Sequence, residues 1–157
     1  MHLLFNHLPI FGSILAAIVL AYGMKTKSLQ TQNASFLVMI ISAIGAAITQ
    51  LTGEGAEEVV ENLQGVSKQM IEEHEEMAAI SFGAMILLGV LSIIAMFLSS
   101  RKSTSLPILA KVILVISVIS FGLLARTGNS GGKIRHSEFN SGAVSNSGGG
   151  EHERDDD

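Results

Sequence analysis

Four long apolar runs constrain the fold of this 157-residue chain more than any other feature of its sequence. The runs cover about residues 8–24, 34–51, 77–98 and 106–125. A helix of roughly 20 apolar residues crosses the hydrocarbon core of a bilayer. Charged residues make up only 15% of the chain, against about a quarter in a typical soluble domain. We therefore predict an all-α integral membrane protein whose four transmembrane helices form an up-and-down bundle.

The polar residues divide the chain into a membrane domain and a tail. Residues 1–138 contain all four predicted spans and form one domain. The remainder, residues 139–157, is rich in Ser and Gly and ends in three aspartates. Such a composition buries too little apolar surface to offset the entropy of ordering. We predict a disordered polar tail there.

The short loops between spans set the orientation. Lys25 and Lys27 lie between the first two spans, and Arg101 and Lys102 lie between the last two. The positive-inside rule assigns both loops to the cytoplasm. In an inner membrane, both termini and the loop 52–76 would then lie on the outer side. All five histidines share that side: His2, His7, His74, His136 and His152.

The outer loop has apolar residues at helical spacing, from Ala56 through Leu63 to Met70. This pattern predicts an amphipathic helix, Glu54–Met70, lying over the mouth of the bundle. A stripe of carboxylates runs beside it: Glu54, Glu57, Glu58 and Glu61. Such a stripe is tolerated when it is solvated, meets cations or receives a basic partner.

Two histidines suggest a ligand site at the mouth. Pro9 is typical of the first turn of a helix, so His7 is expected at the lip of span one, and His74 directly precedes span three. Spans one and three are diagonal neighbours in an up-and-down bundle. Opposed imidazoles are what a bis-histidine haem b requires. The alternative is that these histidines are polar anchors at the membrane interface.

A non-haem divalent metal is a second interpretation of the same residues. The chain has no cysteine, which leaves histidine, carboxylate and methionine as ligands. Mixed nitrogen and oxygen ligation suits zinc, iron or manganese. The candidate ligands are His7, His74, His136, Glu54, Glu57, Glu58 and Glu61. A di-iron carboxylate site is not predicted, because Ile71 and Lys133 stand where its Glu-x-x-His pairs need glutamate.

A glycine pair follows the fourth span. Gly131 and Gly132 can turn through positive φ and let the backbone approach another group closely. A turn there would fold Lys133, Arg135 and His136 back over the mouth, where the two cations could meet haem propionates or the acidic stripe. The alternative is a flexible exit loop.

Two motifs carry a family resemblance. They are His7-Leu8-Pro9-Ile10 and Thr127-Gly128-x-x-Gly131-Gly132, the latter followed by His136. Over about Met1–Glu138 the chain resembles the small bacterial four-helix membrane proteins called domain of unknown function 2231. Leu8 replaces a phenylalanine of the first motif, and the residues after His136 are less typical. The resemblance implies the four-helix architecture and a haem or metal role beside cytochrome modules.

Small residues predict where helices pack. Ser42-x-x-Gly45 and Ala79-x-x-x-Gly83 would allow backbones to approach closely. The mid-span methionines are interpreted as core or lipid-facing filler: Met39, Met85 and Met96.

The sequence has no nucleophilic triad and no phosphate-binding glycine loop, and we do not expect an enzyme acting on its own. The net charge of −4 argues against nucleic-acid binding. We predict a haem-b-binding electron-transfer or redox-accessory subunit, with membrane lipids and an outer-side redox protein as partners. The alternatives are the divalent-metal protein and a structural or assembly subunit without a cofactor.

Overall fold

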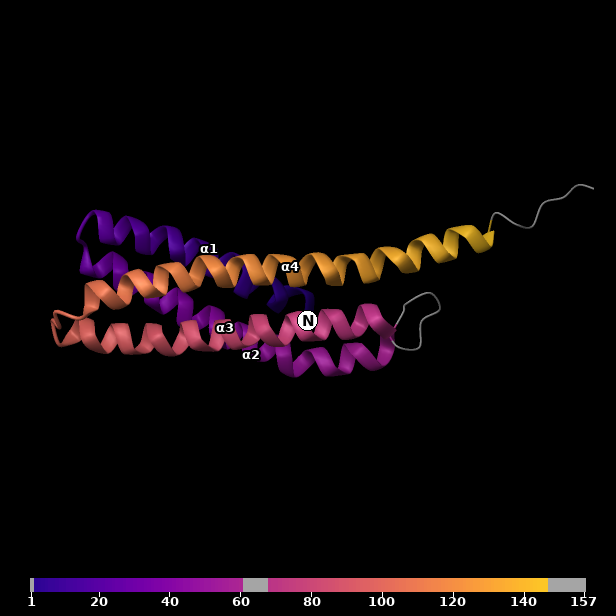
Figure 1. The fold of residues 1–157 in the computed structure, drawn as a ribbon, viewed down its shortest axis with the longest axis horizontal. Helices are drawn as coiled ribbons and strands as arrows, with labels where there is room; N and C mark the ends of the chain where they lie inside the picture. Colours follow the sequence, from indigo (N-terminus) through magenta and orange to yellow (C-terminus); the bar gives the residue numbers. More distant parts are fainter. Residues whose placement is uncertain (1, 61–67, 147–157) are drawn as a thin grey trace, which may run out of the picture.

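The computed structural model describes residues 2–60 and 68–146, and within them the side chains of residues 7–51, 68–69 and 72–132. The described chain is helical apart from two short turns, and no strand occurs in it (Figure 1). The helices are α1 (His2–Lys25), α2 (Leu29–Val60), α3 (Lys68–Ser100) and α4 (Leu106–Asn146).

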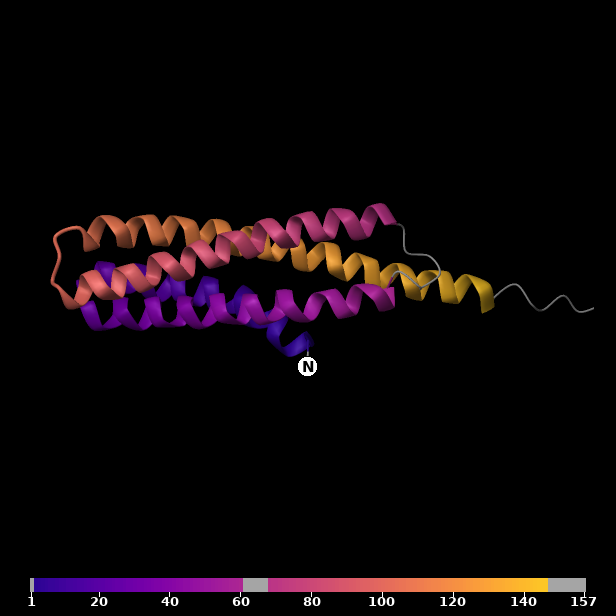
Figure 2. The same cartoon turned by 90° about the horizontal axis from the view of Figure 1, so that it is seen from below.

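The four helices form an up-and-down bundle, as predicted. α1 packs on α2 and α4, and α3 packs on the same two helices. α1 and α3 are therefore diagonal partners. Figure 2 shows the helices running side by side along one axis.

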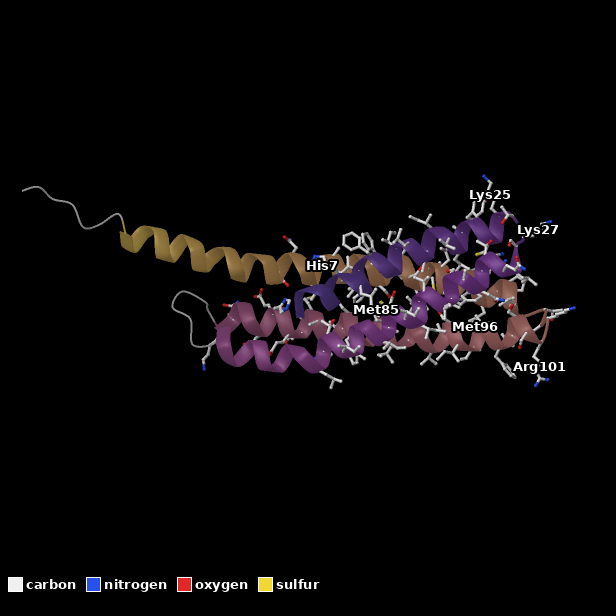
Figure 3. All side chains as sticks on the ribbon, turned by 180° about the vertical axis from the view of Figure 1, so that it is seen from behind. His7, Lys25, Lys27, Met85, Met96 and Arg101 are labelled. Atoms are coloured by element: carbon white, nitrogen blue, oxygen red, sulfur yellow. The ribbon has the colours of Figure 1, made fainter. Side chains whose placement is uncertain are left out.

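Each helix contains a stretch that is long and apolar enough to cross a membrane. These stretches contain the four predicted spans and extend beyond them, as His7–Lys25, Leu29–Leu51, Glu72–Ser100 and Leu106–Gly132. The chain is a membrane protein by this criterion. Figure 3 shows Lys25, Lys27 and Arg101 at one end of the bundle, with His7 away from that end. We call the first end the basic end and the opposite one, which carries His7 and His74, the histidine end.

α1 begins earlier than Pro9 predicted. The helix starts at His2, so Pro9 lies inside it. Proline has no N–H to donate to the carbonyl four residues earlier, and its ring kinks a helix. The first turns of α1 bend away from the rest of the helix (Figure 2). His7 is thus carried on the kinked segment.

Small residues bring the helices close together. Ser35 of α2 donates a hydrogen bond to the Ala16 carbonyl of α1 at 2.7 Å. A Cβ built on Gly45 would stand 2.7 Å from Leu8 Cδ2, so the predicted packing role of Gly45 is confirmed. The second predicted motif behaves differently, because Ala79 and Gly83 are both exposed. Nothing in the described chain lies within 4 Å of a Cβ on Gly83.

The bundle interior mixes large apolar side chains with hydroxyls. Phe36, Met39 and Met85 are fully buried, and Met96 packs against them. The interpretation of these methionines as core filler is confirmed for Met39 and Met85. Serines are also buried on all four helices: Ser13, Ser35, Ser42, Ser81, Ser92, Ser99, Ser117 and Ser120. Half of them bond a carbonyl one turn earlier, namely Ser13, Ser42, Ser92 and Ser117, which satisfies the hydroxyl inside its own helix.

Two predicted segments differ from expectation. No separate helix covers Glu54–Met70, because α2 continues to Val60 and α3 begins at Lys68, while residues 61–67 lie outside the described chain. The tail was predicted to be disordered from residue 139, yet α4 remains helical to Asn146. Residues 147–157 lie outside the described chain. α2, α3 and α4 all extend past the start of α1 at the histidine end (Figure 1).

Candidate functional site at the histidine end

His74 is held against the neighbouring helix by a hydrogen bond. It lies in the second turn of α3 and is half-buried. Its Nδ1 lies 2.8 Å from Ser130 Oγ of α4. Ser130 in turn donates a hydrogen bond to the Thr127 carbonyl at 2.8 Å. The imidazole is thus fixed to the neighbouring helix through one hydroxyl.

These bonds are compatible with a proton on Nδ1 of His74. A serine hydroxyl has a single hydrogen, and Ser130 is placed to give it to the Thr127 carbonyl. With the hydrogen there, Nδ1 of His74 donates to Ser130; in the other tautomer of His74 the roles are reversed. When Nδ1 of a neutral imidazole carries the proton, the other nitrogen, Nε2, keeps its lone pair. This is the arrangement by which metal-ligating histidines are oriented in proteins.

Gly131 supplies the space for the His74 ring. A Cβ built on Gly131 would stand 3.1 Å from His74 Cε1, which is tighter than ordinary van der Waals contact. The close approach expected of this glycine is therefore present, but the predicted turn is wrong. α4 is helical through Gly131 and Gly132. Helical geometry carries residue 136 about 7.5 Å farther along the axis from Gly131 instead of folding it back.

A second polar contact joins α3 to α4 farther from the histidine end. Ser81 Oγ lies 2.9 Å from Thr127 Oγ1. The Thr127 hydroxyl also lies within hydrogen-bond distance of two carbonyls, 3.0 Å from Leu123 and 3.2 Å from Met77. The seam formed by His74, Ser81, Thr127 and Ser130 fixes the height of one helix against the other.

His7 stands at the same end on the diagonal helix. Its ring is exposed and stacks on Phe11, one turn later in α1, with centroids 6.0 Å apart and planes 12° apart. α1 approaches α4 closely here, since a Cβ on Gly128 would lie 3.6 Å from Ile10 Cδ1. The structure therefore places both histidines on the predicted diagonal pair.

The other candidate ligands lie outside the described side chains. They are Glu54, Glu57, Glu58, Glu61, Lys133, Arg135 and His136. The carboxylates beside His74 are described and exposed: Glu72, Glu73, Glu75 and Glu76. Among the described side chains, no three His, Asp or Glu residues come together as a metal-binding group.

Sequence reasoning missed two members of the seam, Ser81 and Ser130. Ser130 lies in the unspecified part of the Thr127–Gly132 motif, three residues after Thr127. Because residues i and i+3 of a helix share one face, Thr127 and Ser130 lie on the same face of α4. Interpreting this segment as a helix instead of a turn would have identified Ser130.

Comparison with known proteins adds no assignment. No protein-family model matches the chain, and no curated protein or solved structure matches it. The resemblance to domain of unknown function 2231 stays a prediction.

Proposed function

We propose that the histidine end binds haem b and that the protein is an electron-transfer or redox-accessory subunit of the bacterial inner membrane. The observation that supports this most is the bond from His74 Nδ1 to Ser130 Oγ at 2.8 Å. With the proton of a neutral imidazole on Nδ1, this bond would orient the ring and leave Nε2 as a ligand atom.

The residue types at this end are ones that can bind haem b. His74 supplies one imidazole from α3, and His7 supplies another from the diagonal helix α1. His7 is exposed and stacks on Phe11, which is exposed on the outer surface of α1, so ligation together with His74 would require the His7 ring to turn toward α3. Bound haem b would supply one-electron transfer. Lys133 and Arg135 follow on α4 as candidates to pair with its propionates.

A divalent metal is the second candidate, and one observation favours it. The continuation of α2 to Val60 carries Glu54, Glu57 and Glu58 to the same end as His74 (Figure 1). Nitrogen and carboxylate ligands together suit zinc, iron or manganese. His136 and Glu61 are further candidate ligands for this metal.

The orientation follows from the basic end. The positive-inside rule assigns Lys25, Lys27, Arg101 and Lys102 to the cytoplasm. The histidine end and both termini then face the outer side, where a redox partner protein would dock.

An absorption spectrum of the purified protein, oxidised and then reduced with dithionite, tests the proposal. We expect a low-spin haem spectrum that His74→Ala or His7→Ala abolishes, because each variant leaves an axial position open. His152→Ala is the matched control and should leave the spectrum unchanged. A colourless protein that loses stoichiometric metal in His74→Ala would establish the second candidate. A protein that holds neither haem nor metal, and whose stability is unchanged by His7→Ala and His74→Ala, would be a structural subunit.

A further inference from the structure

The basic end carries a concentration of positive charge, and no carboxylate of the described residues lies beside it. Five exposed cations lie there: Lys25, Lys27, Arg101, Lys102 and Lys111. Every Asp and Glu of the sequence falls within residues 54–76 or 138–157. Those residues that the structure describes lie at the opposite end (Figure 1). The described chain therefore offers these cations no carboxylate partner.

Lys111 shows at which depth this positive charge lies. It is exposed on α4, five residues after the helix begins, so its Cα is about 7.5 Å inside the apolar span. Its neighbours along the same outward surface are apolar, with Ile108 69% and Val115 59% exposed. A lysine in such a position extends its ammonium along the helix to the membrane interface. The charge of Lys111 is thus delivered at the depth of lipid headgroups.

The lysines of two adjacent helices lie toward the same end of the bundle. α1 and α4 pack together, and Gly128 of α4 lies beside Ile10 of α1. Lys27 follows Ile10 by 17 residues, and Lys111 precedes Gly128 by 17 residues. Because the two helices are antiparallel and the Lys111 side chain extends toward the start of α4, the charges of both lysines are presented at the basic end.

The backbone of both turns also favours a role for the charges. Lys27 and Lys102 adopt φ of 55° and 50°, in the left-handed region. Their turns share one backbone hydrogen-bond pattern. The Ser28 N–H donates to the Gly23 carbonyl, and the Ser103 N–H donates to the Leu98 carbonyl. Glycine is the usual residue at this position of a helix end. Here each turn instead carries a strained lysine.

Arg101 is also directed to the interface. Its guanidinium lies over the Phe97 ring, 5.1 Å from the centroid, and Phe97 is exposed. An aromatic ring on the outer surface and a cation at the same level are typical of the boundary between lipid tails and headgroups.

We propose that the basic end binds the phosphate groups of anionic phospholipids, through Lys25 and Lys27 beside the first turn and Lys111 of α4. The inference is independent of the haem proposal, because it concerns the opposite end of the bundle. Charge complementarity selects this occupant, since juxtamembrane Lys and Arg attract anionic lipids at the membrane surface.

Nanodiscs of phosphatidylcholine alone, or with increasing phosphatidylglycerol, test the proposal with the full-length protein. Native mass spectrometry of protein released from them would count the phosphatidylglycerol retained. We expect the wild type to enrich phosphatidylglycerol over its bulk fraction. The triple variant Lys25→Gln, Lys27→Gln, Lys111→Gln should lower this enrichment about tenfold or more.

Two controls keep the result specific. The Lys→Arg triple at the same positions preserves charge and should preserve the enrichment. Lys68→Gln removes an exposed lysine from the histidine end and should change nothing. The proposal is overturned if the Gln triple retains as much phosphatidylglycerol as wild type, or if Lys68→Gln reduces retention equally. The first result would leave the basic end with a role in topology alone.

Discussion

His74 Nδ1 and Ser130 Oγ lie 2.8 Å apart, joining the start of α3 to the far part of α4 across 56 residues of sequence. The contact couples two effects. It holds two helices at a fixed height, and it orients the imidazole of His74.

Ser130→Ala removes the hydrogen-bond partner of His74 Nδ1. An unpaired, half-buried ring nitrogen costs about 1 kcal/mol or more, so thermal unfolding in detergent should shift to lower temperature. Any cofactor affinity should fall roughly 10- to 100-fold, as when the partner of a ligating histidine is lost. Ser100→Ala is the control, since this exposed hydroxyl bonds only its own helix, at the Phe97 carbonyl. Equal effects of the two variants would contradict a special role for Ser130.

Gly131 and Gly132 form a matched pair for the close approach of His74. Alanine favours a helix over glycine by about 1 kcal/mol. A Cβ at Gly132 meets nothing within 4 Å in the described chain, whereas one at Gly131 crowds the imidazole. We expect Gly132→Ala to stabilise the protein. The Gly131→Ala variant should be less stable than the Gly132→Ala variant by about 1–3 kcal/mol. Chemical denaturation in mixed micelles measures the difference. Identical stabilities would mean that the ring does not pack on Gly131.

Gly89 tests the packing of α2 on α3. A Cβ there would stand 2.6 Å from Ala43 Cβ, and a methyl on a helix cannot rotate away. Gly89→Ala should therefore destabilise the bundle by about 1–3 kcal/mol. Gly83→Ala, on the same helix but facing open space, should be neutral or stabilising. The melting temperatures of the two variants test this packing. A stabilised Gly89→Ala variant would show that α2 and α3 are farther apart at this position.

Replacing Lys27 by glycine should stabilise the protein. An L-residue in the left-handed region is strained by about 1–2 kcal/mol, and glycine is not, so we expect Lys27→Gly to raise the melting temperature in detergent. Lys25→Gly, at the last helical residue of α1, should lower it, because glycine weakens a helix by about 0.5–1 kcal/mol. A loss of stability in Lys27→Gly would contradict the strained geometry.

The orientation can be read with single cysteines, since the chain has none of its own. Ser103→Cys, in the turn before α4, should resist a membrane-impermeant thiol reagent in intact cells. Gln69→Cys, exposed near the start of α3, should react. Labelling in the opposite sense would invert the proposed topology and place both histidines in the cytoplasm.

The sequence by itself determined the architecture. Four apolar runs of about 20 residues have few alternatives to membrane-spanning helices, and short polar turns force neighbours to run antiparallel. The diagonal placement of His7 and His74 followed directly. The packing role of Gly45 also followed, because only a small residue admits so close a neighbour as Leu8.

Only the tertiary structure decided how the ends of the helices are used. Pro9 predicts a helix start and Gly131 with Gly132 predicts a turn, because local propensity favours both, yet both sites lie inside helices. Propensity is a weak term that packing overrides, and here the packing is that of α1 and α3 on α4. The hydrogen bond between His74 and Ser130 depends on the relative height of two helices. No local pattern in the sequence encodes that height.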